Sequence, residues 1–136
     1  MTGAYGATSG TDQREPRELM EGLMVFSLRL EIDVLRGEDA YVNGDRNSRT
    51  LAKEIDFRAL LSVLRPGATI DEQDGDARAS IHVVGGGATL TVGDETAELG
   101  EGQLAVIDSG RPWTLTAATE CAVLLTLAWP REKAGV

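Results

Sequence analysis

Short apolar runs separated by turn residues fill the chain from Arg49 onward, and this pattern constrains the fold more than any other feature. Gly, Pro and Asp stand between the runs at intervals of about 8–12 residues. Runs this short, with turns this frequent, are typical of antiparallel β-sandwiches and barrels rather than parallel α/β sheets. The predicted strands are 50–53, 57–64, 68–70, 79–84, 88–92, 95–99, 104–107, 113–117 and 121–129.

The region before these runs has a different pattern. Leu19, Met20, Leu23 and Met24 recur at helical spacing, which predicts a helical turn. Residues 27–36 fit either a strand, because their apolar residues alternate, or a helix. We expect a helix there, because a serine precedes it as a possible N-cap and a glycine follows it as a stop.

The chain is accordingly divided into three parts. Residues 1–15 are small and polar and are predicted to be a flexible N-terminal tail. Residues 16–48 form an N-terminal helical segment whose last part, 44–48, is rich in turn residues and is expected to be a connection. Residues 49–130 form the β-domain.

Charge excludes several classes of partner. Asp and Glu number 22 against 13 Lys and Arg, for a formal net charge of -9. A polyphosphate or an anionic membrane requires a basic surface, so neither nucleic acid nor membrane is an expected partner. The sequence shows no export signal and its one cysteine cannot form an intrachain disulfide, so we expect a cytoplasmic protein.

Four motifs in order give the β-domain a more specific character. They are Arg65-Pro66-Gly67, then the 81–86 sequence IHVVGG, then 99–102 LGEG, then 109–113 SGRPW. In order and spacing they resemble the turns of the cupin superfamily. Two further segments, 49–53 and 124–130, resemble those of small single-domain bacterial cupins. The resemblance implies a cupin-like antiparallel β-barrel or jelly roll, mostly β, with a short N-terminal helical region. It also implies a pocket inside one end of the barrel and a homodimer.

The metal site is where the sequence departs from that family. The positions of the family's metal ligands fall on Gln73, Gly75, Ala79 (or its neighbour Ser80) and Trp113. Divalent metals of this class require imidazole or carboxylate, whereas an indole offers only an N–H donor. The chain therefore resembles a cupin that lacks the metal-binding histidines, and we expect no metal and no other cofactor.

Acidic residues near these positions leave one alternative open. Asp71, Glu72 and Asp74 lie in the segment that carries the first motif, and His82 follows it. Together they could rebuild a metal site, but they fit no known calcium-loop spacing, and we interpret the acids as a solvated rim. His82 is expected on the outer face of its strand, because Ala79 and its alternates would point inward.

Two further residues have a functional and a structural interpretation. Cys121, at the start of the last strand, is expected to be a packed hydrophobe rather than a nucleophile. Trp113 either fills the barrel interior or stacks on a ligand. The predicted ligand-binding pocket consists of Gln73, Asp74, Ala79, Ile81 and Trp113.

The function predicted from the sequence is that of a metal-free cupin which binds a small molecule in its barrel or serves as a scaffold. The alternative is a cupin enzyme, an isomerase, dioxygenase or cyclase, with a non-standard site around Gln73, Asp74 and Trp113, although no catalytic residue can be assigned. A third class, the ligand-sensing domain of a regulator, is weakened because the sequence contains no helix-turn-helix pattern.

Overall fold

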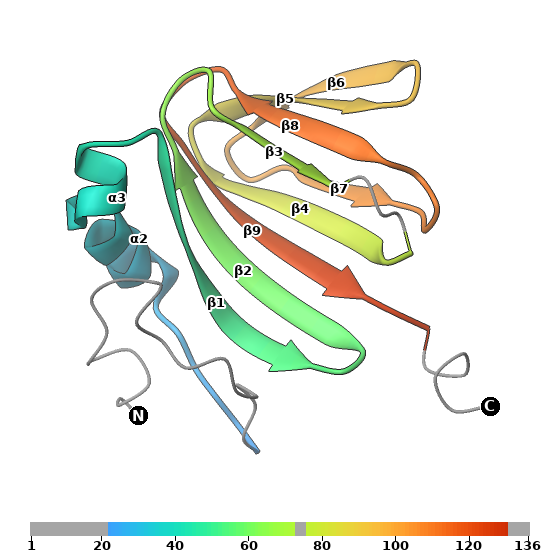
Figure 1. Cartoon of the computed structure of the whole chain (residues 1–136), viewed down its shortest axis with the longest axis horizontal. Helices are drawn as coiled ribbons and strands as arrows, with labels where there is room; N and C mark the ends of the chain where they lie inside the picture. Colours follow the sequence, from blue (N-terminus) through green and yellow to red (C-terminus); the bar gives the residue numbers. More distant parts are fainter. Residues whose placement is uncertain (1–21, 73–75, 131–136) are drawn as a thin grey trace.

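Two helices are followed by nine strands in the described part of the chain, a computed structural model covering residues 22–72 and 76–130 (Figure 1). The helix predicted at 27–36 and the predicted order of strands are confirmed. The elements are α2 (Leu28–Gly37), α3 (Asp39–Val42), β1 (Arg46–Glu54), β2 (Phe57–Leu64), β3 (Thr69–Glu72), β4 (Arg78–Gly85), β5 (Gly87–Val92), β6 (Glu95–Gly100), β7 (Leu104–Ile107), β8 (Trp113–Ala117) and β9 (Cys121–Ala128).

The strands form two antiparallel sheets that face each other as a jelly roll. One sheet has the order β1-β2-β9-β4-β7 and the other the order β3-β8-β5-β6. The links β2–β3, β4–β5, β6–β7 and β8–β9 all cross from sheet to sheet at one end, which we call the closed end. At the opposite, open end the sheets are joined by the links β3–β4 and β7–β8. The fold is therefore mostly β, as predicted, although the two sheets do not close into a continuous barrel.

A single apolar layer fills the space between the sheets. Because side chains alternate along a strand, each strand contributes every second residue to this layer. The register puts Ile81 opposite Leu125 and Leu90 opposite Leu115, and all four are buried. The buried members of the layer, here called the inner core, are Leu64, Ala68, Ala79, Ile81, Val83, Ala88, Leu90, Ile107, Trp113, Leu115, Ala117, Cys121, Val123, Leu125 and Leu127.

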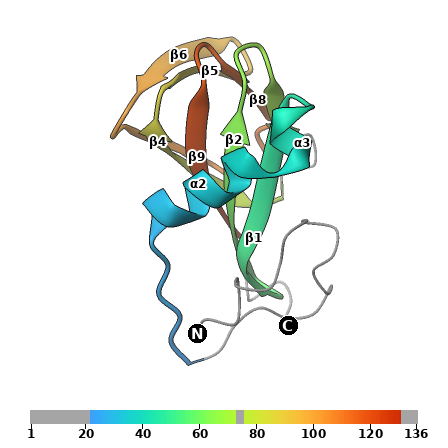
Figure 2. The same cartoon turned by 90° about the vertical axis from the view of Figure 1, so that its left-hand side faces the viewer.

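The two helices cover part of the outer face of the five-stranded sheet (Figure 2). Ile32 and Leu35 of α2 and Tyr41 of α3 bury their side chains against β1, β2 and β9, where Leu51 and Leu61 lie. Packing of this apolar stripe stabilises helices that would be too short to persist alone. The N-terminal helical region is thus part of the folded unit.

Polar side chains also hold α2 to β1 and explain one wrong boundary. Residues 44–48 were predicted to be a turn-rich connection, but β1 already begins at Arg46. Asn47 and Arg49 are buried on the helix-covered face, where Asn47 Nδ2 donates to Leu35 O at 3.0 Å and Arg49 lies 3.6 Å from Glu31. The strand lacks apolar alternation because polar groups occupy its covered positions.

The helical turn predicted from Leu19 to Met24 is also wrong where the structure describes it. Residues 22–27 contain no helix, and the first described helix begins at Leu28. Leu23 and Val25 are 83% and 74% exposed, so no packing compensates for the entropy of helix formation. The predicted tail and residues 16–21 lie outside the described residues.

The glycine triplet 85–87 forms a tight crossing at the closed end. The pairing of β4 with β9 changes register between Val83 and Gly85, and Gly86 has a φ angle of +80°. A Cβ at Gly86 would lie 2.0 Å from the carbonyl oxygen of Glu120. Only glycine allows both the backbone conformation and this approach to the β8–β9 link.

Replacing this glycine tests the closed end directly. We expect Gly86→Ala to lower the free energy of unfolding by at least about 2 kcal/mol, because it combines left-handed strain with a backbone clash. The matched control is Gly85→Ala, whose Cβ would meet no atom within 4 Å. Urea unfolding of both variants makes the comparison, and equal stability would contradict this description of the turn.

Candidate functional site

Trp113 is the largest side chain of the inner core at the open end. It is the first residue of β8 and is paired with Glu72 of β3 on one side and Val92 of β5 on the other. Only 4% of Trp113 is exposed. The indole therefore fills the space between the sheets near their open end, which is the first of the two roles predicted for it.

The other predicted pocket residues divide into two groups. Ala79 and Ile81 lie on β4, are buried, and belong to the same inner core as Trp113. Gln73 and Asp74 lie outside the described residues, as does Gly75. The structure thus brings Ala79, Ile81 and Trp113 into one apolar layer at the open end.

The residues described at the metal-ligand positions do not fit a metal. Ala79 presents a methyl group and Trp113 an indole, both enclosed by hydrocarbon. Within residues 22–72 and 76–130, no group of three or more His, Cys, Asp and Glu side chains is placed to hold an ion. Divalent metals of this class require imidazole or carboxylate donors, and these two positions supply neither.

An arginine that the sequence reasoning missed lies on the same inner face. Arg58 pairs with Leu127 of β9, whose side chain belongs to the inner core. Its guanidinium carbon lies 5.4 Å from the ring centroid of Trp129, within the range of a cation–π contact. The Nε of Arg58 is buried and has no hydrogen-bond partner among the described residues. Alternation along 57–64 could have indicated its inward orientation.

Two more charged residues share this face near the open end. Lys53 of β1 lies directly opposite Arg58 in the register, and directly opposed residues project from the same face of a sheet. By the same rule Glu72, opposite Trp113, faces inward, whereas Asp71, opposite Thr114, faces outward. The predicted acidic rim is therefore divided between the two faces of β3.

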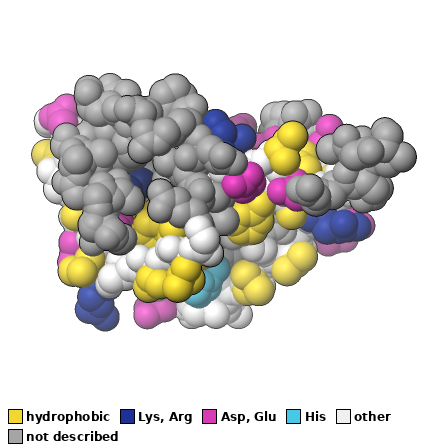
Figure 3. Space-filling view, turned by 90° about the horizontal axis from the view of Figure 1, so that it is seen from below, with side chains coloured by type: hydrophobic (Ala, Val, Ile, Leu, Met, Phe, Trp, Pro, Cys, Tyr) yellow, Lys and Arg dark blue, Asp and Glu magenta, His cyan; other side chains and the backbone are white. Residues whose placement is uncertain are grey.

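His82 lies on the outer face of the five-stranded sheet, as predicted. Its neighbours along β4, Ile81 and Val83, are buried in the inner core. His82 itself is half-buried and is paired with Leu104 of β7 and Leu124 of β9. Figure 3 shows hydrophobic side chains beside the histidine on this face. His82 is therefore separated from the inner core by the sheet.

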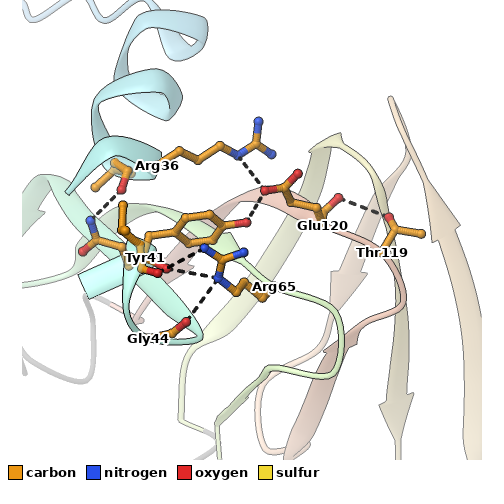
Figure 4. A network of polar contacts seen from close by, with 9 residues as sticks. Arg36, Tyr41, Gly44, Arg65, Thr119 and Glu120 are labelled. Carbon is orange, nitrogen blue, oxygen red and sulfur yellow. Dashed lines mark hydrogen bonds and ion pairs between the residues drawn. The ribbon is translucent and has the colours of Figure 1, made fainter. Parts of the chain in front are cut away.

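A polar network joins the helices to the closed end (Figure 4). The Tyr41 hydroxyl donates to Glu120, whose carboxylate also lies 4.0 Å from Arg36 Nε. Arg65 stacks on the Tyr41 ring at 4.4 Å, and its Nε donates to the carbonyl oxygens of Tyr41 and Gly44 at the end of α3. Burial, and then the Glu120 contact, raise the pKa of Tyr41 above its usual value. The network has a structural role: the Tyr41 hydroxyl and the Glu120 carboxylate bind each other and connect α3 to the β8–β9 link.

Cys121 adjoins this network and is fully buried in the inner core. Burial raises the pKa of its thiol to about 11, although Arg36 acts in the opposite direction. A reactive cysteine needs a lowered pKa and access to solvent. The expectation that Cys121 is a packed hydrophobe is therefore confirmed.

The comparisons with known proteins agree with this architecture. The AraC-binding-like domain family matches residues 49–135, and the chain belongs to that family, which is of the cupin type. A search of curated proteins gave no match. None of the described helices is long and apolar enough to cross a membrane.

Solved structures extend the likeness to the whole fold. A conserved protein of unknown function from Streptococcus pyogenes is 25% identical, with a TM-score of 0.66 over 91% of this chain and 97% of that one. A cupin superfamily protein from Desulfitobacterium hafniense is 11% identical, with a TM-score of 0.65 over 86% of this chain and 100% of that one. An HTH_3 family transcriptional regulator from Vibrio cholerae is 18% identical, with a TM-score of 0.60 over 76% of this chain and 62% of that one.

The buried thiol predicts a pH dependence of stability. Below about pH 9 the thiol is protonated in both the folded and the unfolded chain. Because its pKa rises from 9.0 to about 11 on folding, the unfolded chain alone loses the proton between these values. This difference should cost roughly 2–3 kcal/mol of stability by pH 11.

Urea unfolding at pH 8 and pH 10.5 measures the effect. Tyr41 titrates in the same alkaline range, so the control is Cys121→Ala, which keeps Tyr41 and loses only the thiol. We expect the stability of the wild type to fall more steeply with pH than that of Cys121→Ala. Parallel pH profiles would show that Cys121 ionises freely in the folded state.

Proposed function

We propose that this protein is a metal-independent cupin domain that binds a small organic molecule at the open end of its two sheets. The observation that carries the proposal is the set of side chains gathered there. Trp129 is partly buried and provides aromatic surface beside the buried Trp113, and Arg58 places a charged group against the Trp129 ring. An apolar environment with a few convergent polar groups is the usual composition of a small-molecule site.

Independence from metal follows from the donors at the family's ligand positions. Ala79 cannot coordinate an ion, and the Trp113 indole occupies space that an imidazole and its metal would need. A catalytic alternative around Gln73, Asp74 and Trp113 would depend on one amide, one carboxylate and one indole N–H donor. Binding without chemistry needs fewer groups and is the simpler role for this interior.

A sensing role suits a binding domain of this kind. The family takes its name from a domain like that of AraC, and one similar structure is a transcriptional regulator. The formal charge of -9 disfavours contact of this chain with nucleic acid. In this proposal the chain supplies ligand recognition, and any effect on a partner follows from ligand binding.

A thermal-shift screen of chelator-treated protein against small metabolites tests the proposal. A ligand of the folded state raises the melting temperature by mass action. For each hit, ¹H–¹⁵N spectra should show shifts of the Trp113 and Trp129 indole signals and little change at Gly86 and Glu120 of the closed end. Hits that act only at the closed end or near His82, or that require added metal, would contradict the proposal.

We also propose that the chain forms a homodimer through β7 and the adjoining outer face. β7 is an edge strand, and its Leu104 and Val106 are 60% and 71% exposed. Phe57, on the same face at the other side of the sheet, is 37% exposed. An uncovered apolar edge strand favours pairing with a second copy around a two-fold axis. His82 would then lie beside the interface.

Light scattering tests this assembly at micromolar concentration. We expect a mass twice that of the 14.5 kDa chain for the wild type, and the single-chain mass for Val106→Lys, because a lysine opposes edge pairing. The matched control is Ile55→Lys in the turn between β1 and β2, where Ile55 is 77% exposed; it should remain dimeric. A monomeric wild type, or a dimeric Val106→Lys, would contradict the assignment.

A further inference from the structure

Two positive charges lie directly opposite each other at the open end. The hairpin of β1 and β2 pairs Lys53 with Arg58 in the register, and both side chains are half-buried. Like charges placed opposite each other on a sheet destabilise it, and partial burial reduces the screening by water. Glu54 and Asp56 lie beside the pair in the same hairpin, and each takes part in an interaction of its own. The direct opposition of Lys53 and Arg58 is therefore a repulsion that a bound anion would relieve.

Arg58 also retains an unused hydrogen-bond donor. Its Nε is covered and meets no acceptor in the described part of the chain. Buried donors without a partner are rare, and each needs an explanation such as an ion or a ligand. Because one face of the guanidinium lies over Trp129, the N–H groups at its edge are left to meet a planar acceptor. A carboxylate fits such an edge with two parallel hydrogen bonds.

The surroundings favour a small flat acid over a simple ion. On the inward face of β1, β2 and β3 near the open end, the register places the two cations Lys53 and Arg58 and the carboxylate of Glu72. The adjoining surface is apolar and aromatic, with Trp129 packed on the inner core that contains Trp113. A hydrated inorganic anion would gain nothing from these rings, whereas an aromatic body would stack on them.

We propose that the open end binds a small aromatic carboxylate, with Arg58 and Lys53 holding the acid group and Trp129 contacting the ring. The inference rests on the proposed function and adds the chemical class of the ligand. It also explains the like-charged pair: the two cations repel each other in the free protein and share one anion in the complex.

Tryptophan fluorescence provides the assay, because the only two tryptophans of the chain, Trp113 and Trp129, both lie at this end. The probes are benzoate, salicylate and cinnamate, each measured beside its neutral amide, together with inorganic phosphate. We expect at least one acid to bind saturably and at least tenfold more tightly than its amide. Phosphate should neither bind nor compete.

Variants of Arg58 and Lys53 test whether these two cations hold the acid group. We expect Arg58→Gln to weaken binding of the acid at least tenfold, Arg58→Lys to restore part of the loss, and Lys53→Gln to weaken binding several-fold. The matched control is Arg78→Gln, an exposed residue at the same end whose Nε lies 3.2 Å from Asp108; it should bind like the wild type. Without ligand, Lys53→Gln should melt no lower than the wild type, because it removes a repulsion.

The outcomes separate this inference from the proposed function. Amides that bind as well as acids, phosphate that competes, or an Arg58→Gln variant with wild-type affinity would overturn the carboxylate assignment. If neutral compounds from the thermal-shift screen still bind beside the tryptophans, the proposed function stands without the inference. If neither acids nor neutral compounds bind there, both are wrong.

Discussion

The apolar layer between the two sheets is the constraint on which the rest of the structure depends. Each strand contributes alternate residues to it, and the crossings at the closed end bring the sheets close enough to exclude water. The backbone at Gly86 approaches the backbone of Glu120 so closely that a side chain at Gly86 would have no room. At the open end Trp113 completes the layer. A metal centre would need several polar donors directed into this space, and Ala79 and Trp113 leave hydrocarbon there instead.

Polar interactions lie outside this apolar layer or at its ends, and most of them hold the helices to the sheet. Glu31 and Arg49 form a buried pair under α2, and breaking such a pair is costly because it leaves one charge buried alone. The network of Tyr41, Arg65 and Glu120 fixes α3 at the closed end. The Nε of Arg58 is a buried donor without a described hydrogen-bond partner, and the guanidinium lies against the Trp129 ring. Glu31 Oε1 and Arg36 Nε are likewise buried without a described hydrogen-bond partner, but each lies within 4.0 Å of an opposite charge.

The sequence predicted most of the fold because turn residues and alternation report local physics. Gly, Pro and Asp marked the links between strands, and the serine and glycine around 27–36 marked a helix. Prediction failed where tertiary contacts override the pattern. β1 begins at Arg46 because its polar residues face the helices, and Leu23 lacks the packing that would make its helical spacing effective.

The candidate site was only partly predictable for a related reason. Strand periodicity predicts that Ala79 and Ile81 point inward and that His82 points outward, and the structure shows both orientations. Arg58 was overlooked because a charged residue within an apolar run looks like a solvent-facing position. Its importance depends on its position beside Trp129, and the pairing of β2 with the distant β9 cannot be obtained from local sequence alone.

The proposed independence from metal is tested most directly by elemental analysis of the protein purified without chelator. If Trp113 and Ala79 replace the metal site, iron, manganese, nickel and zinc should each be present far below one atom per chain, and the folded state should be unchanged by a chelator. One atom of any of these metals per chain, retained through dialysis and lost together with stability on chelation, would contradict a metal-independent domain.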